Sequence, residues 1–152
     1  MTDVPTFQEP AYRHHPGVTP RPVGGPVAEI SSAVSRETAL DDPVVQRALR
    51  YGLFLIDLRY FWEAHEVWEP VWLACPPNGR ARLLLRALIQ AANAHLKREM
   101  NRPRAVVRLA RDARQVLAEL HAADGEAFMG VVVSRLSADL EALAIPTDDV
   151  KG

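Results

Sequence analysis

Residues 80–99 read RARLLLRALIQAANAHLKRE, and this stretch decides the fold. At 3.6 residues per turn, its apolar side chains cover most of the circumference of a helix. Four of its polar residues form one narrow strip: Arg82, Arg86, Asn93 and Lys97. Because a helix with so little polar surface is expected to pack on two sides, residues 80–99 predict the central helix of an all-α protein.

Two helices are predicted before the central one. Asp42 can cap a helix that begins at Pro43 and runs to about residue 57. A second helix is predicted from about Tyr60 to Ala74, where the Pro-Pro-Asn-Gly turn at 76–79 ends it. This turn is short, so the second helix and the central helix are expected to be antiparallel.

Two further helices are predicted after the central one. Asn101 and Pro103 open a helix that ends before Asp124-Gly125, and the last helix covers roughly Val131 to Leu143. The sequence shows no alternating strand pattern and no internal repeat. Residues 43–145 therefore predict a five-helix bundle or array, followed by a C-terminal tail at 146–152.

The first 42 residues differ in composition from the rest of the chain. Their helix-breaking residues are Pro5, Pro10, Pro16, Pro20, Pro22, Pro26, Gly17, Gly24 and Gly25. Such residues favour extended or turning backbone, and the apolar residues between them are too sparse to build a core. Residues 1–42 are therefore predicted to be a Pro/Gly-rich arm, which is either disordered or extended across the domain or a neighbouring subunit.

Composition limits the classes of function. A chain of 152 residues fits one domain, and its net charge of -1 gives no overall attraction to nucleic acid or anionic lipid. One cysteine, no signal-like N-terminus and no apolar run of membrane-spanning length predict a cytoplasmic protein without a membrane partner. Exposed apolar area on the central helix or on a docked arm would favour a homodimer.

The chemically unusual stretch is YFWEAHEVWEPVW at residues 60–72. On an ideal helix, His65 and Glu69 lie one turn apart in the middle of its aromatic face, whereas Glu63 points away. Because a buried polar pair without partners costs several kcal/mol, we expect His65 and Glu69 to hydrogen-bond to each other or to the central helix. Pro70 removes the bond to the Glu66 carbonyl and predicts a kink or break at 66–70.

This stretch, with Leu88-Ile89-Gln90 and the small residues after it, resembles the uncharacterised helical family "domain of unknown function 309". The resemblance covers about residues 45–145 and implies an all-helical fold. It also implies no activity. The signature positions that it marks are His65, Glu66, Glu69, Trp72 and Gln90. The chain departs from the family at Pro70, where an ordinary helix former is usual, and in its long arm.

Two interpretations of this region stay open. In the first, the cluster is structural, with room for a small ligand; its members are Trp62, His65, Glu66, Glu69, Trp72 and Gln90. In the second, the His-Glu-x-x-Glu site is a metal-dependent or acid–base enzyme site, because it is similar to the His-Glu-x-x-His zinc motif. A divalent metal would then bind His65, Glu69 and His95, with His121 as a further available imidazole. The sequence does not decide whether the chain is an enzyme.

A third interpretation is nucleic-acid or anion binding through residues 80–114. This segment holds ten basic residues against Glu99 and Asp112, a charge of +8. No aromatic residue lies between the basic ones for base stacking, and an arginine-rich helix surface is commonly just solvated, which counts against this interpretation. A glycine-rich phosphate loop and a serine-hydrolase signature are also missing from the sequence, which excludes those enzyme classes.

Overall fold

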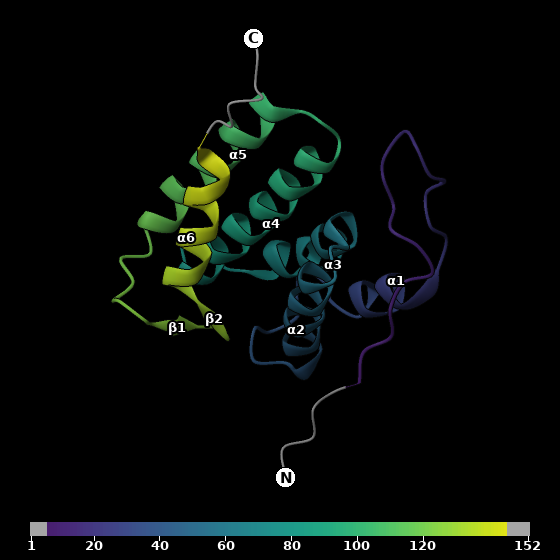
Figure 1. Ribbon diagram of the computed structural model, residues 1–152. Coiled ribbons are helices and arrows are strands. Elements are labelled where there is room, and N and C mark those ends of the chain that lie inside the picture. Colours follow the sequence, from purple (N-terminus) through teal and green to yellow (C-terminus); the bar gives the residue numbers. More distant parts are fainter. Residues whose placement is uncertain (1–5, 146–152) are drawn as a thin grey trace.

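The computed structural model describes residues 6–145, which form six helices and one small hairpin (Figure 1). The elements are α1 (Gly25–Ser32), α2 (Pro43–Asp57), α3 (Phe61–Ala74), α4 (Arg80–Glu99), α5 (Pro103–Ala118), β1 (Ala127–Phe128), β2 (Val131–Val132) and α6 (Val133–Ala144). The predicted all-α class is confirmed. Within residues 6–145, no helix has both the length and the apolar character that crossing a membrane requires.

Local sequence signals account for the ends of the long helices. The Asp42 carboxylate accepts a hydrogen bond of 3.0 Å from the backbone N–H of Val44, and Pro43 is the first residue of α2. At the C-terminal end of α3, the backbone of Cys75 is extended and Pro76 follows it, so the helix stops there. A kink or break was predicted at 66–70; a break does not occur, because α3 is continuous from Phe61 to Ala74 with Pro70 inside it.

Helix α4 is central, as predicted, and packs against α3 on one side and α5 on the other. Two contacts show that α3 and α4 are antiparallel. The ring of Phe61 stacks on that of His95 with 4.8 Å between centroids, and the Arg82 guanidinium lies 4.3 Å from the centre of the Trp72 ring. Residues at the start of α3 thus face the end of α4.

The core between α2 and α3 is built around Trp68, which is 1% exposed. Its indole N–H donates to the Leu49 carbonyl at 3.4 Å. The indole lies directly against Gly52, where there is no side chain to hold the two helices apart.

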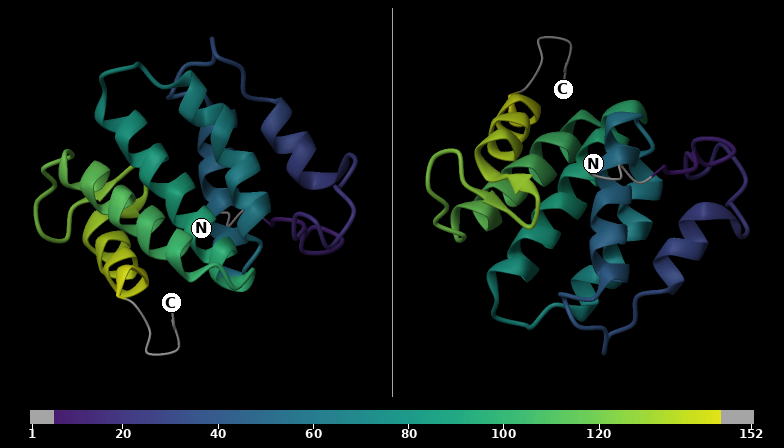
Figure 2. Two further views of the ribbon diagram at one scale, coloured as in Figure 1. Left: turned by 90° about the horizontal axis from the view of Figure 1, so that it is seen from above. Right: turned by 90° about the horizontal axis from the view of Figure 1, so that it is seen from below.

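The arm contains a helix that was not predicted. Residues 25–32 form α1, and Ile30 and Val34 are buried in the core. Helical periodicity did not reveal α1, because this helix is short and begins among glycines and Pro26. Residues 6–24 of the arm lie on the same side of the molecule as α1, away from α5 and α6 (Figure 2). The predicted tail at 146–152 lies outside the described residues.

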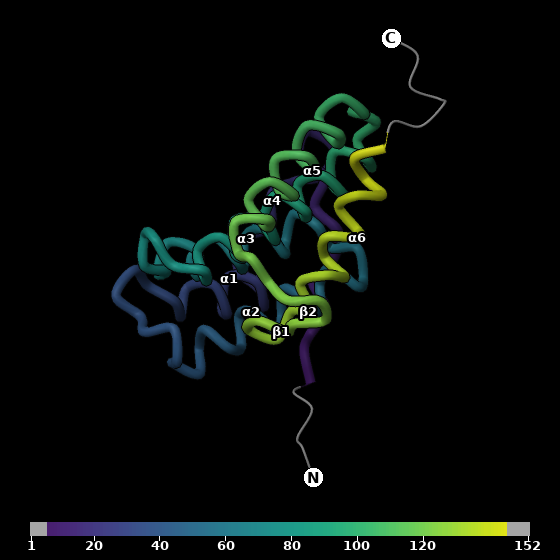
Figure 3. Tube along the Cα trace, turned by 90° about the vertical axis from the view of Figure 1, so that its left-hand side faces the viewer, coloured from purple at the N-terminus to yellow at the C-terminus, as the bar shows by residue number. Residues whose placement is uncertain are grey.

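The hairpin was also not predicted. Ala127 pairs with Val132 and Phe128 with Val131, in antiparallel register. Met129 and Gly130 connect the strands with φ of 52° and 81°, the backbone conformation of a tight two-residue hairpin turn. Two residues per strand are too few to show alternation. The hairpin lies at the N-terminal end of α6 (Figure 3).

Candidate functional site

The buried face of α3 is not the one that its aromatic residues predict. It is formed by Ala64, Val67, Trp68 and Val71, which are at most 1% exposed. At 100° per residue, the centre of this face lies about 100° from His65. The side chains of His65 and Glu69 are 27% and 50% exposed. The prediction that both are enclosed by indole rings is therefore wrong.

His65 and Glu69 do pair with each other. His65 Nε2 lies 3.2 Å from Glu69 Oε2, one turn along α3. An ion pair this exposed contributes at most about 1 kcal/mol to stability. The pair therefore does not tie α3 to α4.

The predicted metal site is not formed. The imidazole of His95 is occupied, because its Nε2 lies 2.9 Å from Asp139 Oδ2 and its ring stacks on Phe61. Within residues 6–145, no three His, Cys, Asp or Glu side chains gather in a way that could hold a metal ion. His121, the other candidate imidazole, lines a groove between α5 and α6.

The remaining signature residues are spread over two sides of α3. Trp62 lies under the arm, where the His14 ring meets its indole edge-on at 4.5 Å and Arg21 lies 5.9 Å from its centre. Trp72 lies on the α4 side, beneath Arg82. Trp72 Nε1 and Gln90 Oε1 are buried without hydrogen-bond partners in the described part of the chain. Glu66 is half-buried.

The buried acid of α3 is Glu63, which sequence analysis placed on the outward face. Its side chain is 1% exposed. Glu63 Oε2 accepts a hydrogen bond of 2.8 Å from the backbone N–H of His14, whereas Oε1 has no partner within residues 6–145. Burial raises the pKa of this carboxyl, and the His14 N–H opposes that rise.

Two tyrosines hold the arm above Glu63. The Tyr51 hydroxyl donates to the Gln8 carbonyl at 2.7 Å, and the Tyr60 hydroxyl donates to Glu9 Oε1 at 3.2 Å. Burial, with a smaller contribution from the charge of Glu63, raises the pKa of Tyr51 to about 12. Both hydroxyls thus stay protonated donors at neutral pH.

A cavity of about 320 Å³ lies between the arm and Glu63. Its other lining residues all belong to 8–12 and 22–27. Helical periodicity could not reveal this site, because the segment that buries Glu63 comes from outside the bundle. The one feature of the sequence that pointed to this site was the length of the arm, which is enough to cover a helix face.

The family comparison agrees with the resemblance noted in the sequence. Residues 49–109 match the model of a family described as "Domain of unknown function (DUF309)". The matched segment contains all of α3 and α4, and so includes Glu63 and each signature position. The searches of curated proteins and of solved structures found no match.

Proposed function

We propose that this chain, which carries the DUF309 segment in residues 49–109, binds a small ligand with an ammonium group against Glu63, beneath the arm. The observation that carries the proposal is the unpartnered Oε1 of a carboxylate that is 1% exposed and lines a cavity. A buried carboxylate is costly unless a hydrogen-bond donor or an opposite charge compensates it. A ligand ammonium group supplies both.

The other walls of the cavity support this choice of ligand charge. They contain a second carboxylate, Glu9, and no lysine, arginine or histidine, so an anionic ligand would find no counter-charge there. Much of the remaining lining is apolar, from Pro10, Pro22, Val23, Pro26, Val27 and their neighbours. An amine carried on a short apolar body matches this combination of surfaces.

Calorimetric titration with phenethylamine tests the proposal, with 2-phenylethanol as the uncharged control. The wild-type chain should bind the amine and not the alcohol. Glu63→Gln keeps the shape of the side chain and removes its charge, and should weaken amine binding at least about tenfold, because a charge-assisted hydrogen bond contributes about 1.5–3 kcal/mol.

The matched control is Glu66→Gln, which removes the same charge from the same helix at a residue that does not line the cavity. Its affinity for the amine should stay within about twofold of wild type, since a neutralised charge outside the site acts only at long range. Equal losses in the two variants, or no amine binding to the wild-type chain, would reject the proposal.

A cytoplasmic location and a homodimer stay predictions. The location is supported by the single cysteine, Cys75, which is buried and free. The homodimer can be tested by light scattering, which should give a molar mass of about twice 16.9 kDa.

A further inference from the structure

A row of arginines runs along the outer face of α5. Arg104, Arg108 and Arg111 are exposed and, at 100° per residue, lie within about 60° of one another around the helix. Arg102 and Arg114 flank the row and are also exposed. Within residues 6–145, none of these five arginines forms an ion pair.

Two arginines elsewhere in the described part of the chain have acidic partners. Arg59 pairs with Glu99 at 3.0 Å, and Arg80 pairs with Glu126 at 2.8 Å. Asp112 is the one acidic residue in the sequence of α5. The row is therefore a local concentration of positive charge on a chain whose net charge is -1.

The opposite face of α5 fixes the row in place. That face is buried in the core through Val106, Ala110, Ala113, Val116 and Leu117. Because the helix is anchored along its whole length, the spacing of the arginine Cα atoms is set by the helix itself. Arg104 and Arg108 are about 6 Å apart along the axis, and Arg108 and Arg111 about 4.5 Å.

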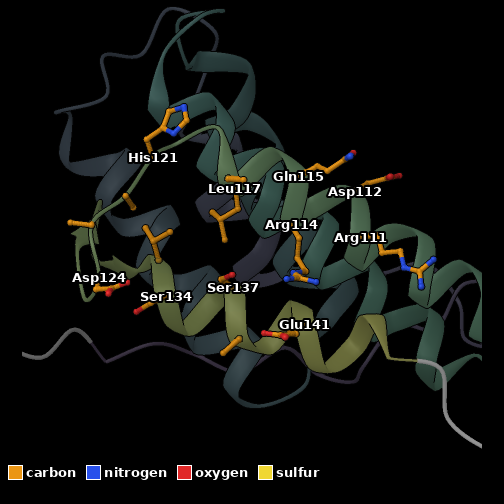
Figure 4. Close-up of a pocket in the computed structure, with 15 residues that line it drawn as sticks. Arg111, Asp112, Arg114, Gln115, Leu117, His121, Asp124, Ser134, Ser137 and Glu141 are labelled. Atoms are coloured by element: carbon orange, nitrogen blue, oxygen red, sulfur yellow. The ribbon is translucent and has the colours of Figure 1, made fainter.

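The row borders a groove of about 840 Å³ between α5 and α6. Figure 4 shows Arg114 directed across this groove toward Ser137. Ser134 and Ser137 supply hydroxyl donors on the far wall. Three acidic residues, Asp112, Asp124 and Glu141, also line the groove. The positive surface is therefore the outer face of α5 and not the groove as a whole.

We propose that the arginine row of α5 binds the phosphate backbone of double-stranded nucleic acid. Each duplex strand carries one charge per about 3.4 Å of axis, so the row of about 10 Å spans about three phosphates. Guanidinium groups bind phosphate oxygens in a planar, two-pronged geometry, which suits this contact.

The surroundings of the row favour a duplex over other polyanions. Single-stranded nucleic acid is usually held by aromatic stacking, and α5 contains no aromatic residue. An anionic membrane needs apolar side chains that insert, and the exposed large apolar residues among 6–145 are Tyr12, Val18, Val23 and Ile145, none of them on α5. Backbone contacts with a duplex need only spaced cations.

Fluorescence anisotropy with a labelled DNA duplex tests this proposal. Binding should weaken with salt between about 50 and 200 mM, because phosphate contacts release counterions. The triple variant Arg104→Gln, Arg108→Gln, Arg111→Gln should lose at least about tenfold in affinity at about 50 mM salt. Its slope of log affinity against log salt should be less negative by about 2.7, at about 0.9 per lost contact.

A charge-matched control removes three other exposed arginines, with Arg36→Gln, Arg47→Gln and Arg50→Gln, and should stay within about threefold of wild type. The proposal is overturned if this control loses as much affinity as the α5 variant. It is also overturned by salt-independent binding, by no binding up to about 100 µM protein, or by tighter binding to a single strand or to phosphatidylserine vesicles.

Discussion

The indole of Trp68 occupies the position that the Cβ atom of any other residue at position 52 would take. A Cβ atom on Gly52 would overlap the indole nitrogen and its neighbouring ring carbons. The same indole N–H reaches the Leu49 carbonyl, so the tryptophan is held from the side of α2 as well as packed against it. Gly52 thus allows α2 and α3 to approach each other closely around the core.

Gly52→Ala should lower the free energy of unfolding by about 2–3 kcal/mol, because the methyl group forces either the indole or α2 to shift. Urea denaturation measures this change. Gly79→Ala is the control: an added Cβ there would meet only Pro76 atoms at 3.8 and 3.9 Å, and φ is −94°. It should change stability by less than about 1 kcal/mol. Similar losses at both positions would refute the close contact.

Glu63 should make wild-type stability depend on pH. Its folded-state pKa is raised by burial above the ordinary value of 4.5. As the pH rises through 4.5, Glu63 loses its proton in the unfolded chain but keeps it in the folded chain. Folding therefore becomes less favourable with rising pH until the pH exceeds the raised pKa. The stability of wild type relative to Glu63→Gln should therefore fall between about pH 4 and pH 7, as urea denaturation at the two pH values can measure.

The arm supplies a control for this pH dependence. Deleting residues 1–16 removes His14 and its hydrogen bond to Glu63, and exposes the carboxylate to water. In the shortened chain, the stability difference between the parent and its Glu63→Gln variant should no longer change with pH. A persistent pH effect would show that the burial of Glu63 does not come from residues 1–16.

His65→Ala should cost less than about 1 kcal/mol, because the imidazole is 27% and its Glu69 partner 50% exposed. Leu84→Ala, at a fully buried position on α4, should cost about 2–5 kcal/mol in the same denaturation experiment. A loss near that of Leu84→Ala would restore the enclosed His65–Glu69 cluster predicted from the sequence.

Cys75 should resist alkylation in the folded chain. Burial raises its pKa to about 11, and its thiol donates to the Val71 carbonyl. The reactive thiolate is therefore scarce at neutral pH. Mass spectrometry after iodoacetamide treatment should show no modification in buffer and complete modification in guanidinium. Rapid reaction of the native chain would mean that the end of α3 opens readily.

The long helices could be predicted because their signals are local. Asp42 and Pro43 start α2, and the prolines after Cys75 end α3, whatever the rest of the chain does. The near-complete apolar surface of residues 80–99 likewise requires neighbours on two sides. Short elements such as α1 and the β1–β2 hairpin carry too few residues for their periodicity to stand out.

The orientation of α3 could not be predicted in the same way. Its large rings suggested one face. In the structure Trp72 lies at the edge of the buried face, Trp62 lies on the opposite side of α3, and small residues such as Ala64 lie near the centre of the buried face. The burial of Glu63 depends on a segment about fifty residues away in the chain. Helical spacing carries no information about such a cover, so the candidate site emerged only from the tertiary structure.

Two of the bonds that hold the arm on the helices are made to its main chain. Tyr51 donates to the carbonyl of Gln8, and Glu63 accepts the amide N–H of His14, so neither bond depends on which side chains occupy those two positions. Substitutions at Gln8 and His14 should therefore preserve these two bonds, whereas one residue inserted or lost between the two positions should move one of the two peptide groups out of reach.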